Sequence, residues 1–179
     1  LSLGVSTDDG RAPLVLERAI AHLTSDMVVV AAAGNHGSAE ITDGERVAIG
    51  MPLHHNAPLF PAALDNVLAV GALDQGGRPA AFNPRGDGDE TTAPWIDVWA
   101  RGVEVKSLYL GSSEGPENVR VENAEREVEY VPFEGWADWS GTSFAAAEIT
   151  AAVARRLAGG MNPAEATEDV RAEYGGADA

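Results

Sequence analysis

The sequence predicts an α/β domain, built on a mostly parallel sheet that is flanked by helices. Two continuous apolar runs, 26–33 and 66–72, are typical of strands that are buried on both faces. Apolar residues at helical spacing over 13–22 precede the first run. This alternation of strands and helices is the pattern of a sheet with right-handed crossover connections.

In the first half of the chain, residues 1–5 are short and apolar and are expected to form a buried strand. A helix over 13–22 follows, because Pro13 suits a first helical turn. The strands over 26–33 and 66–72 come next, with an irregular segment between them.

In the second half, 95–99 and 103–105 are expected to be short strands. Residues 119–122 and 127–131 alternate between apolar and polar side chains, which predicts an exposed β-hairpin. We expect this hairpin to be an insertion over about 106–135.

Two helices are expected to close the sequence. The first starts near Ser143 and ends at Gly159. The second has Asn162 as its cap, Pro163 at its first position and Glu165 at its third, which is a capping-box pattern.

The composition excludes several classes of function. The 179 residues suit one domain or part of a larger one. Twelve Lys and Arg against 28 Asp and Glu give a net charge of −16, which disfavours nucleic acid and anionic membranes as partners. Cysteine is absent, so disulfides, thiolate zinc sites and cysteine nucleophiles are excluded. No apolar run approaches the ~20 residues of a membrane span. The compartment stays open between bacterial secretion and the cytoplasm.

Three separated segments carry the chemistry. The first is Val-Val-Val-Ala-Ala-Ala-Gly-Asn-His-Gly at 28–37, and the second is Phe-Pro-Ala-Ala-Leu-Asp-Asn-Val-Leu-Ala-Val-Gly-Ala at 60–72. The third, at 139–147, is Trp-Ser-Gly-Thr-Ser-Phe-Ala-Ala-Ala. In this order and at these spacings they resemble the subtilisin-like serine peptidases, the subtilases of peptidase family S8. Residues 1–4 and 95–103 also look like strands of that family.

The resemblance implies a serine endopeptidase that works through an acyl-enzyme on Ser143. A serine hydroxyl is a weak nucleophile and needs a base beside it. Ser143 is expected at a helix N-terminus, where free backbone N–H groups favour developing negative charge. By the resemblance, the side chain of Asn35 and the backbone N–H of Ser143 form the oxyanion hole.

The resemblance also implies a set of residues that bind a peptide or protein substrate. Backbone groups of Leu3 and Gly4 would flank the bound peptide on one side, and those of Ala33 and Gly34 on the other. Thr142, next to the nucleophile, completes the expected substrate contacts.

No cofactor is required by this chemistry, and no metal ligands are assigned. The acidic loop residues Asp87, Asp89 and Glu90 leave a structural calcium ion open, although their spacing matches no specific site. The adjacent His54 and His55 are expected at the surface rather than on a metal ion.

The family's catalytic Asp and His segments do not occur in this sequence. His22 is expected to face solvent, and His36 follows the oxyanion asparagine at a position where the family tolerates many residues. We therefore expect residues 1–179 to be the C-terminal portion of a subtilase catalytic domain whose N-terminal part is missing. That part, in the same or a separate chain, is the expected partner, and this chain alone is expected to be inactive.

Two other functions compete with this hypothesis. A catalytically degenerate subtilase, or pseudoprotease, would keep the peptide groove as a binding or scaffold module. Two departures from the family pattern, at Arg101 and at Ala147 with Glu148, indicate a divergent member. An unrelated α/β hydrolase would carry a Gly-x-Ser-x-Gly elbow, which the sequence lacks.

Overall fold

The computed structural model describes residues 1–38, 54–86, 92–109, 117–122, 128–133 and 135–176. The chain divides into two compact units. The first, the sheet unit, comprises residues 1–103 together with 141–179, and the second, the ribbon unit, is Glu104–Ser140.

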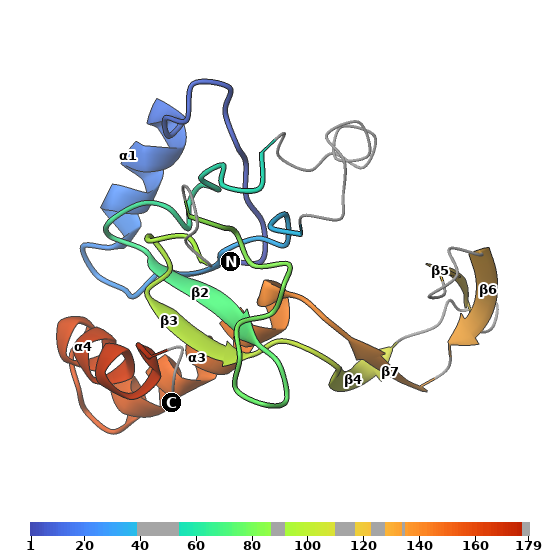
Figure 1. Ribbon diagram of the computed structural model, residues 1–179. Coiled ribbons are helices and arrows are strands. Elements are labelled where there is room, and N and C mark those ends of the chain that lie inside the picture. Colours follow the sequence, from blue (N-terminus) through green and yellow to red (C-terminus); the bar gives the residue numbers. More distant parts are fainter. Residues whose placement is uncertain (39–53, 87–91, 110–116, 123–127, 134, 177–179) are drawn as a thin grey trace. The chain divides into compact units, whose positions relative to one another are not determined.

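A parallel sheet forms the centre of the sheet unit (Figure 1). Its strands are β1 (Val30–Ala32), β2 (Leu68–Leu73) and β3 (Val98–Arg101), in the order β1-β2-β3. In this register Ala31 lies beside Ala69, and both neighbouring pairs of strands are parallel. The predicted parallel α/β architecture is therefore confirmed.

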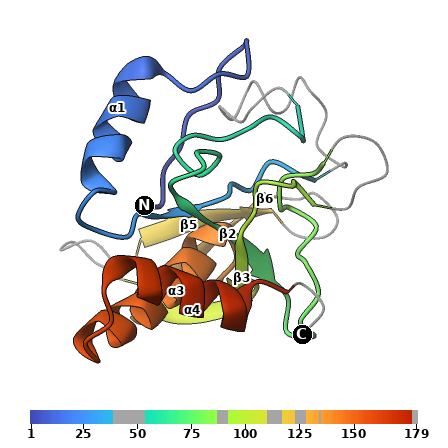
Figure 2. The same cartoon turned by 90° about the vertical axis from the view of Figure 1, so that its left-hand side faces the viewer.

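Helices cover both faces of this sheet (Figures 1 and 2). Helix α1 (Leu14–Leu23) lies on one face, and helices α3 (Thr142–Ala158) and α4 (Pro163–Tyr174) lie on the other. Successive residues of a strand point to opposite faces. Thus Val70 belongs to the core beneath α3, while Ala69 belongs to the core beneath α1.

The small side chains of α3 allow the helix to approach the sheet closely. Ala145 and Ala152 are completely buried in the core that α3 shares with β2 and β3.

Helix α4 begins with the predicted capping box. The Asn162 side chain accepts from the Glu165 backbone N–H at 3.0 Å, and the Glu165 carboxylate accepts from the Asn162 N–H at 2.9 Å.

Ionic contacts hold α4 against its neighbours. Arg156 of α3 bonds to Asp169 at 2.5 Å and also to Glu173, both on α4. These two carboxylates raise the pKa of the Arg156 guanidinium above its ordinary value. Arg171 of α4 donates to Asp97 at 3.1 Å, just before β3. Helix α4 is thereby tied to both α3 and the sheet.

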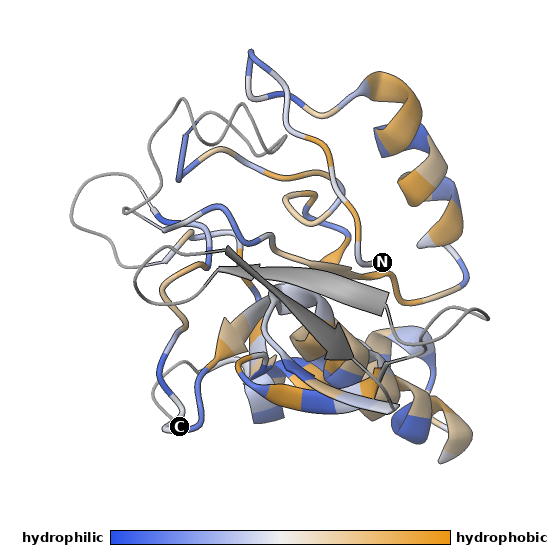
Figure 3. Cartoon of the chain, turned by 90° about the vertical axis from the view of Figure 1, so that its right-hand side faces the viewer, coloured by the Kyte–Doolittle hydropathy of each residue, from blue (hydrophilic) through white to orange (hydrophobic). Residues whose placement is uncertain are grey.

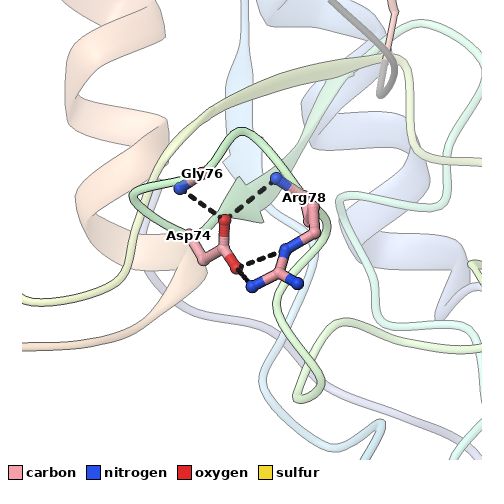
Figure 4. Close-up of polar contacts among 3 residues, drawn as sticks. All are labelled: Asp74, Gly76 and Arg78. Carbon is pink, nitrogen blue, oxygen red and sulfur yellow. Dashed lines mark hydrogen bonds and ion pairs between the residues drawn. The ribbon is translucent and has the colours of Figure 1, made fainter.

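A tight turn follows β2 (Figure 4). The Asp74 carboxylate accepts from the backbone N–H groups of Gly76 and Arg78, at 2.7 and 3.0 Å, and from the Arg78 guanidinium at 2.9 and 3.1 Å. These bonds, led by the one from the Arg78 backbone N–H, lower the pKa of Asp74. The turn folds the chain back so that Ala80 donates to Ala72 at 2.9 Å.

The element boundaries differ from the sequence-based expectation at several places. Residues 1–5 form no regular strand, because only Leu1 bonds to β1 and only Val5 pairs with Phe60. The run 26–33 contributes only the three residues of β1 to the ladder with β2. Strand β3 begins three residues later and ends two residues later than the expected strand over 95–99.

The described residues of the ribbon unit form two antiparallel pairs of strands. Strand β4 (Val105–Tyr109) pairs with β7 (Gly135–Trp139). Strands β5 (Glu117–Glu122) and β6 (Val128–Phe133) form the predicted hairpin, whose connecting residues 123–127 lie outside the described part of the chain. The pairing of β4 with β7 was not predicted, and the status of the hairpin as an insertion stays a prediction.

Apolar side chains also lie on the surface of the sheet unit. Figure 3 colours each residue by hydropathy and shows that α1 carries both hydrophobic and hydrophilic residues. Helix α1 exposes Leu14 and Val15, the latter to 83%. Leu1, Leu3 and Val5 are exposed along the N-terminal segment. Within the described ranges, no helix combines the length and the apolar character that crossing a membrane requires.

Candidate active site

The carboxyl end of β1 and the N-terminus of α3 meet at one edge of the sheet unit. Ligand sites of open parallel sheets lie at the carboxyl ends of the strands. Gly34 and Asn35 follow β1 here, and Thr142 and Ser143 open α3. Gly34 has a φ of +113°, and a Cβ at this position would lie 2.8 Å from the His36 ring, so only glycine fits.

Thr142 fixes the orientation of the Asn35 amide. The Thr142 backbone N–H donates to Asn35 Oδ1 at 2.9 Å, and its hydroxyl donates to the same oxygen at 3.0 Å. The Thr142 hydroxyl oxygen in turn accepts from the Gly34 N–H at 3.1 Å. Because Oδ1 accepts two bonds from Thr142, the Asn35 Nδ2 group is directed away from it. Gly141 leaves room beside Nδ2, where a Cβ would lie at 3.2 Å.

Ser143 lies in the first turn of α3, where backbone N–H groups have no intrahelical acceptor. The first turn holds no acidic residue, and Arg155 and Arg156 lie in the last turn. No acidic side chain in the first turn therefore neutralises the positive end of the helix dipole at Ser143. The serine side chain is half-buried.

A cleft of about 200 Å³ brings most of the predicted site residues together. It is lined by six of the seven residues that the sequence nominated, namely Leu3, Gly4, Gly34, Asn35, Thr142 and Ser143. The seventh, Ala33, is completely buried, and its N–H donates to the Val70 carbonyl at 2.9 Å. Any contact of Ala33 with a peptide would therefore run through its carbonyl group.

A comparison with protein families identifies the family of this chain. The model described as the subtilase family, peptidase S8, matches residues 1–173. The chain belongs to the subtilase family. It is thus a member of a family of serine endopeptidases, as the motifs around Asn35 and Ser143 predicted.

Curated relatives of this subtilase chain include subtilisins. It is 35% identical to subtilisin BL of Lederbergia lenta over 99 residues, which cover 55% of the chain and 28% of the relative. It is 38% identical to the thermophilic serine proteinase of Bacillus sp. (strain AK1) over 85 residues, which cover 48% of the chain and 15% of the relative. The matched region is therefore less than a third of either relative.

Solved structures of the same fold cover nearly the whole chain. The prenylagaramide maturation protease PagA aligns with 92% of the chain and 46% of its own, at a TM-score of 0.57 and 24% identity. The self-cleaved protease domain of PatA aligns with 94% of the chain and 49% of its own, at a TM-score of 0.56 and 24% identity. The subtilase chain spans about half of these two structures.

The structure also adds residues to the cleft of this subtilase that the sequence did not nominate. Leu59, His36, Ser2 and Ala32 complete its lining. His36 is 1% exposed, and its Nε2 donates to the Ala57 carbonyl at 2.9 Å, because a carbonyl can only accept. Leu59 had no signal in the sequence, because its place depends on tertiary pairing.

The remaining predicted polar sites of the subtilase chain lie away from this cleft. His22, His54 and His55 are exposed, as expected. The described ranges contain no cluster of three or more His, Asp or Glu side chains suited to hold a metal ion. The acidic segment of the proposed calcium site, 87–90, lies outside the described residues.

Proposed function

We propose that this chain supplies the nucleophile and the oxyanion hole of a subtilisin-type serine endopeptidase. The observation that carries the proposal is the arrangement of Asn35 and Ser143 on one cleft. Asn35 is held there by two bonds to its Oδ1, and Ser143 opens α3. Its peptide or protein substrates are cleaved without a cofactor.

The reaction begins with attack of Ser143 Oγ on the scissile carbonyl carbon. A histidine outside this chain, oriented by an aspartate that also lies outside it, takes the hydroxyl proton. The resulting oxyanion accepts hydrogen bonds from Asn35 Nδ2 and the Ser143 N–H. The C–N bond then breaks, the histidine gives its proton to the leaving amine, and an acyl-enzyme remains. Water hydrolyses this ester by the same steps.

The bound peptide lies extended between two segments of backbone. Leu3 and Gly4 flank it on one side, and Ala33 and Gly34 flank it on the other. Support for this placement comes from the exposure of Leu3 and from the presence of Leu3, Gly4 and Gly34 on the cleft wall. Thr142 acts on the substrate through Asn35, since its own side chain is completely buried.

The partner that completes the site is the N-terminal part of the same domain, in the same or a separate polypeptide. We expect it to carry the histidine and the aspartate and to cover the exposed apolar segment of Leu1, Leu3 and Val5. The 179-residue chain by itself is expected to hydrolyse no peptide.

The test is active-site labelling of the complete protein with a fluorophosphonate, followed by mass spectrometry of the labelled peptide. We expect a single adduct on Ser143, which Ser143→Ala abolishes together with peptide hydrolysis. Ser140→Ala, three residues earlier, is the matched control and should keep both. A correctly folded complete protein with no adduct would show a degenerate peptide-binding module instead.

A further inference from the structure

The side chain of Leu59 lies between the two backbone segments that flank the cleft. Its Cδ2 methyl group is 2.6 Å from the position that a Cβ on Gly4 would take. The same methyl group is 3.0 Å from the corresponding position on Gly34. The leucine methyl group therefore lies in the gap between the two glycines.

Four hydrogen bonds hold the backbone around Leu59. Two residues before it, the Ala57 carbonyl accepts from His36 Nε2 at 2.9 Å. One residue after it, Phe60 exchanges two bonds with Val5, at 2.8 and 2.9 Å. The Leu59 carbonyl itself accepts from the Ala63 N–H at 2.9 Å. The backbone at Leu59 is therefore held in place on both sides.

The proposed chemistry determines which part of a substrate meets Leu59. When the scissile carbonyl carbon lies at Ser143 Oγ and its oxygen at Asn35 Nδ2, the Cα of the acyl residue is one bond away. Its side chain must then enter the part of the cleft between Gly4 and Gly34. Leu59 narrows this part of the cleft, because its Cδ2 methyl group lies within 3.0 Å of the positions that a Cβ would take on both Gly4 and Gly34.

We propose that Leu59 is a specificity-determining residue that restricts cleavage to bonds after small side chains, such as those of Gly, Ala and Ser. This inference rests on the proposed function, because it needs Ser143 as the nucleophile. A phenylalanine or leucine side chain would overlap the Leu59 methyl groups or force the anchored segment to move. His36 supports the restriction by holding Ala57 in place.

The test compares coumarin amides of tetrapeptides that differ only in the residue before the scissile bond, Ala, Leu or Phe. With the complete wild-type protein, kcat/KM for Ala should exceed that for Phe by roughly 10- to 100-fold, the range over which apolar pockets discriminate by size. Leu59→Ala should raise the ratio of kcat/KM for the Phe substrate to that for the Ala substrate by at least about tenfold. Leu59→Gly, which opens the space further, should extend the shift.

Two controls separate this inference from the function on which it rests. Leu157→Ala, on a partly exposed leucine of α3, should leave the substrate profile unchanged. Leu59→Met keeps the volume and should keep the preference for Ala even if the smaller variants fold poorly. A wild-type preference for Phe, or an unchanged profile in Leu59→Ala while Ser143 is still labelled, would overturn the inference alone. Absence of labelling at Ser143 would overturn the proposed function and this inference with it.

Discussion

Replacement of Thr142 by valine tests whether Asn35, the proposed oxyanion donor, is held in place by the hydrogen bonds of Thr142. Valine has nearly the shape of threonine but lacks the hydroxyl, so packing at this completely buried position is preserved. The change removes the 3.0 Å bond to Asn35 Oδ1 and leaves the Gly34 N–H without its acceptor. The 2.9 Å bond from the backbone N–H of residue 142 to Asn35 remains.

The magnitude follows from these two losses. A buried donor left without a partner costs about 1–3 kcal/mol, and the lost side-chain bond costs about 1 kcal/mol more. We therefore expect Thr142→Val to lower the free energy of unfolding by about 2–4 kcal/mol. Asn35 keeps one of its two orienting bonds, so kcat should fall by about five- to tenfold. Complete loss of an oxyanion donor costs about 10²–10³, a magnitude known from subtilisin itself.

The assay is urea unfolding of the complete protein combined with steady-state kinetics. Thr142→Ser keeps the hydroxyl and should restore most of the stability and activity. Thr150→Val, at an exposed position of the same helix, removes a hydroxyl that donates to the Ala146 carbonyl at 2.7 Å, and should change stability by less than about 0.5 kcal/mol. A loss below about 0.5 kcal/mol in Thr142→Val would refute the assigned role of the hydroxyl.

Two further predictions concern the chain after β2. Asn83 is buried, its Oδ1 accepts from the Ala72 N–H at 2.7 Å, and its Nδ2 donates to the Ala72 and Ala80 carbonyls, both at 2.8 Å. Asn83→Leu should therefore lower the free energy of unfolding by about 3 kcal/mol, measured by urea unfolding, and a loss under about 1 kcal/mol would contradict this. Asp74 has a lowered pKa, so its contribution to stability is present above its unfolded-state value of about 3.8 and is lost as the pH falls through the folded-state pKa. The difference in urea midpoint between wild type and Asp74→Asn should reach its largest value near pH 6 and be smaller near pH 3. Equal differences at both pH values would contradict the lowered pKa of Asp74.

The strands and helices of the sheet unit could be predicted because each of them depends on a pattern of neighbouring residues. The apolar runs gave β1 and β2, and the cap at Asn162 with Glu165 gave the start of α4. The Gly-Thr-Ser segment gave the start of α3. In each case the physical signal lies within about ten consecutive residues, as hydrophobic periodicity or capping chemistry.

What the sequence did not predict depends on contacts between distant segments. Strand β7 pairs with β4 across the whole hairpin, and no local pattern in its two-tryptophan segment identified that partner. The position of Leu59 in the cleft wall follows from the pairing of Phe60 with Val5 and from the bond between Ala57 and His36. The hydrogen bonds that orient Asn35 come from Thr142, which lies 107 residues further along the chain. Such contacts are consequences of the assembled fold.

The chain leaves the sheet unit after Val103 and returns to it at Gly141. This arrangement has a consequence for the length of the ribbon unit between them. The Gly141 N–H donates to the Gly102 carbonyl at 2.7 Å, and a Cβ on Gly102 would collide with Ala72 and with the Gly141 carbonyl. The start of α3 is thus held from inside the sheet unit, whatever the length of Glu104–Ser140. Doubling the length of a flexible loop raises the free-energy cost of closing it by only about 0.6 kcal/mol. A ribbon unit of a different length would therefore leave the start of α3, and Ser143 with it, where they are.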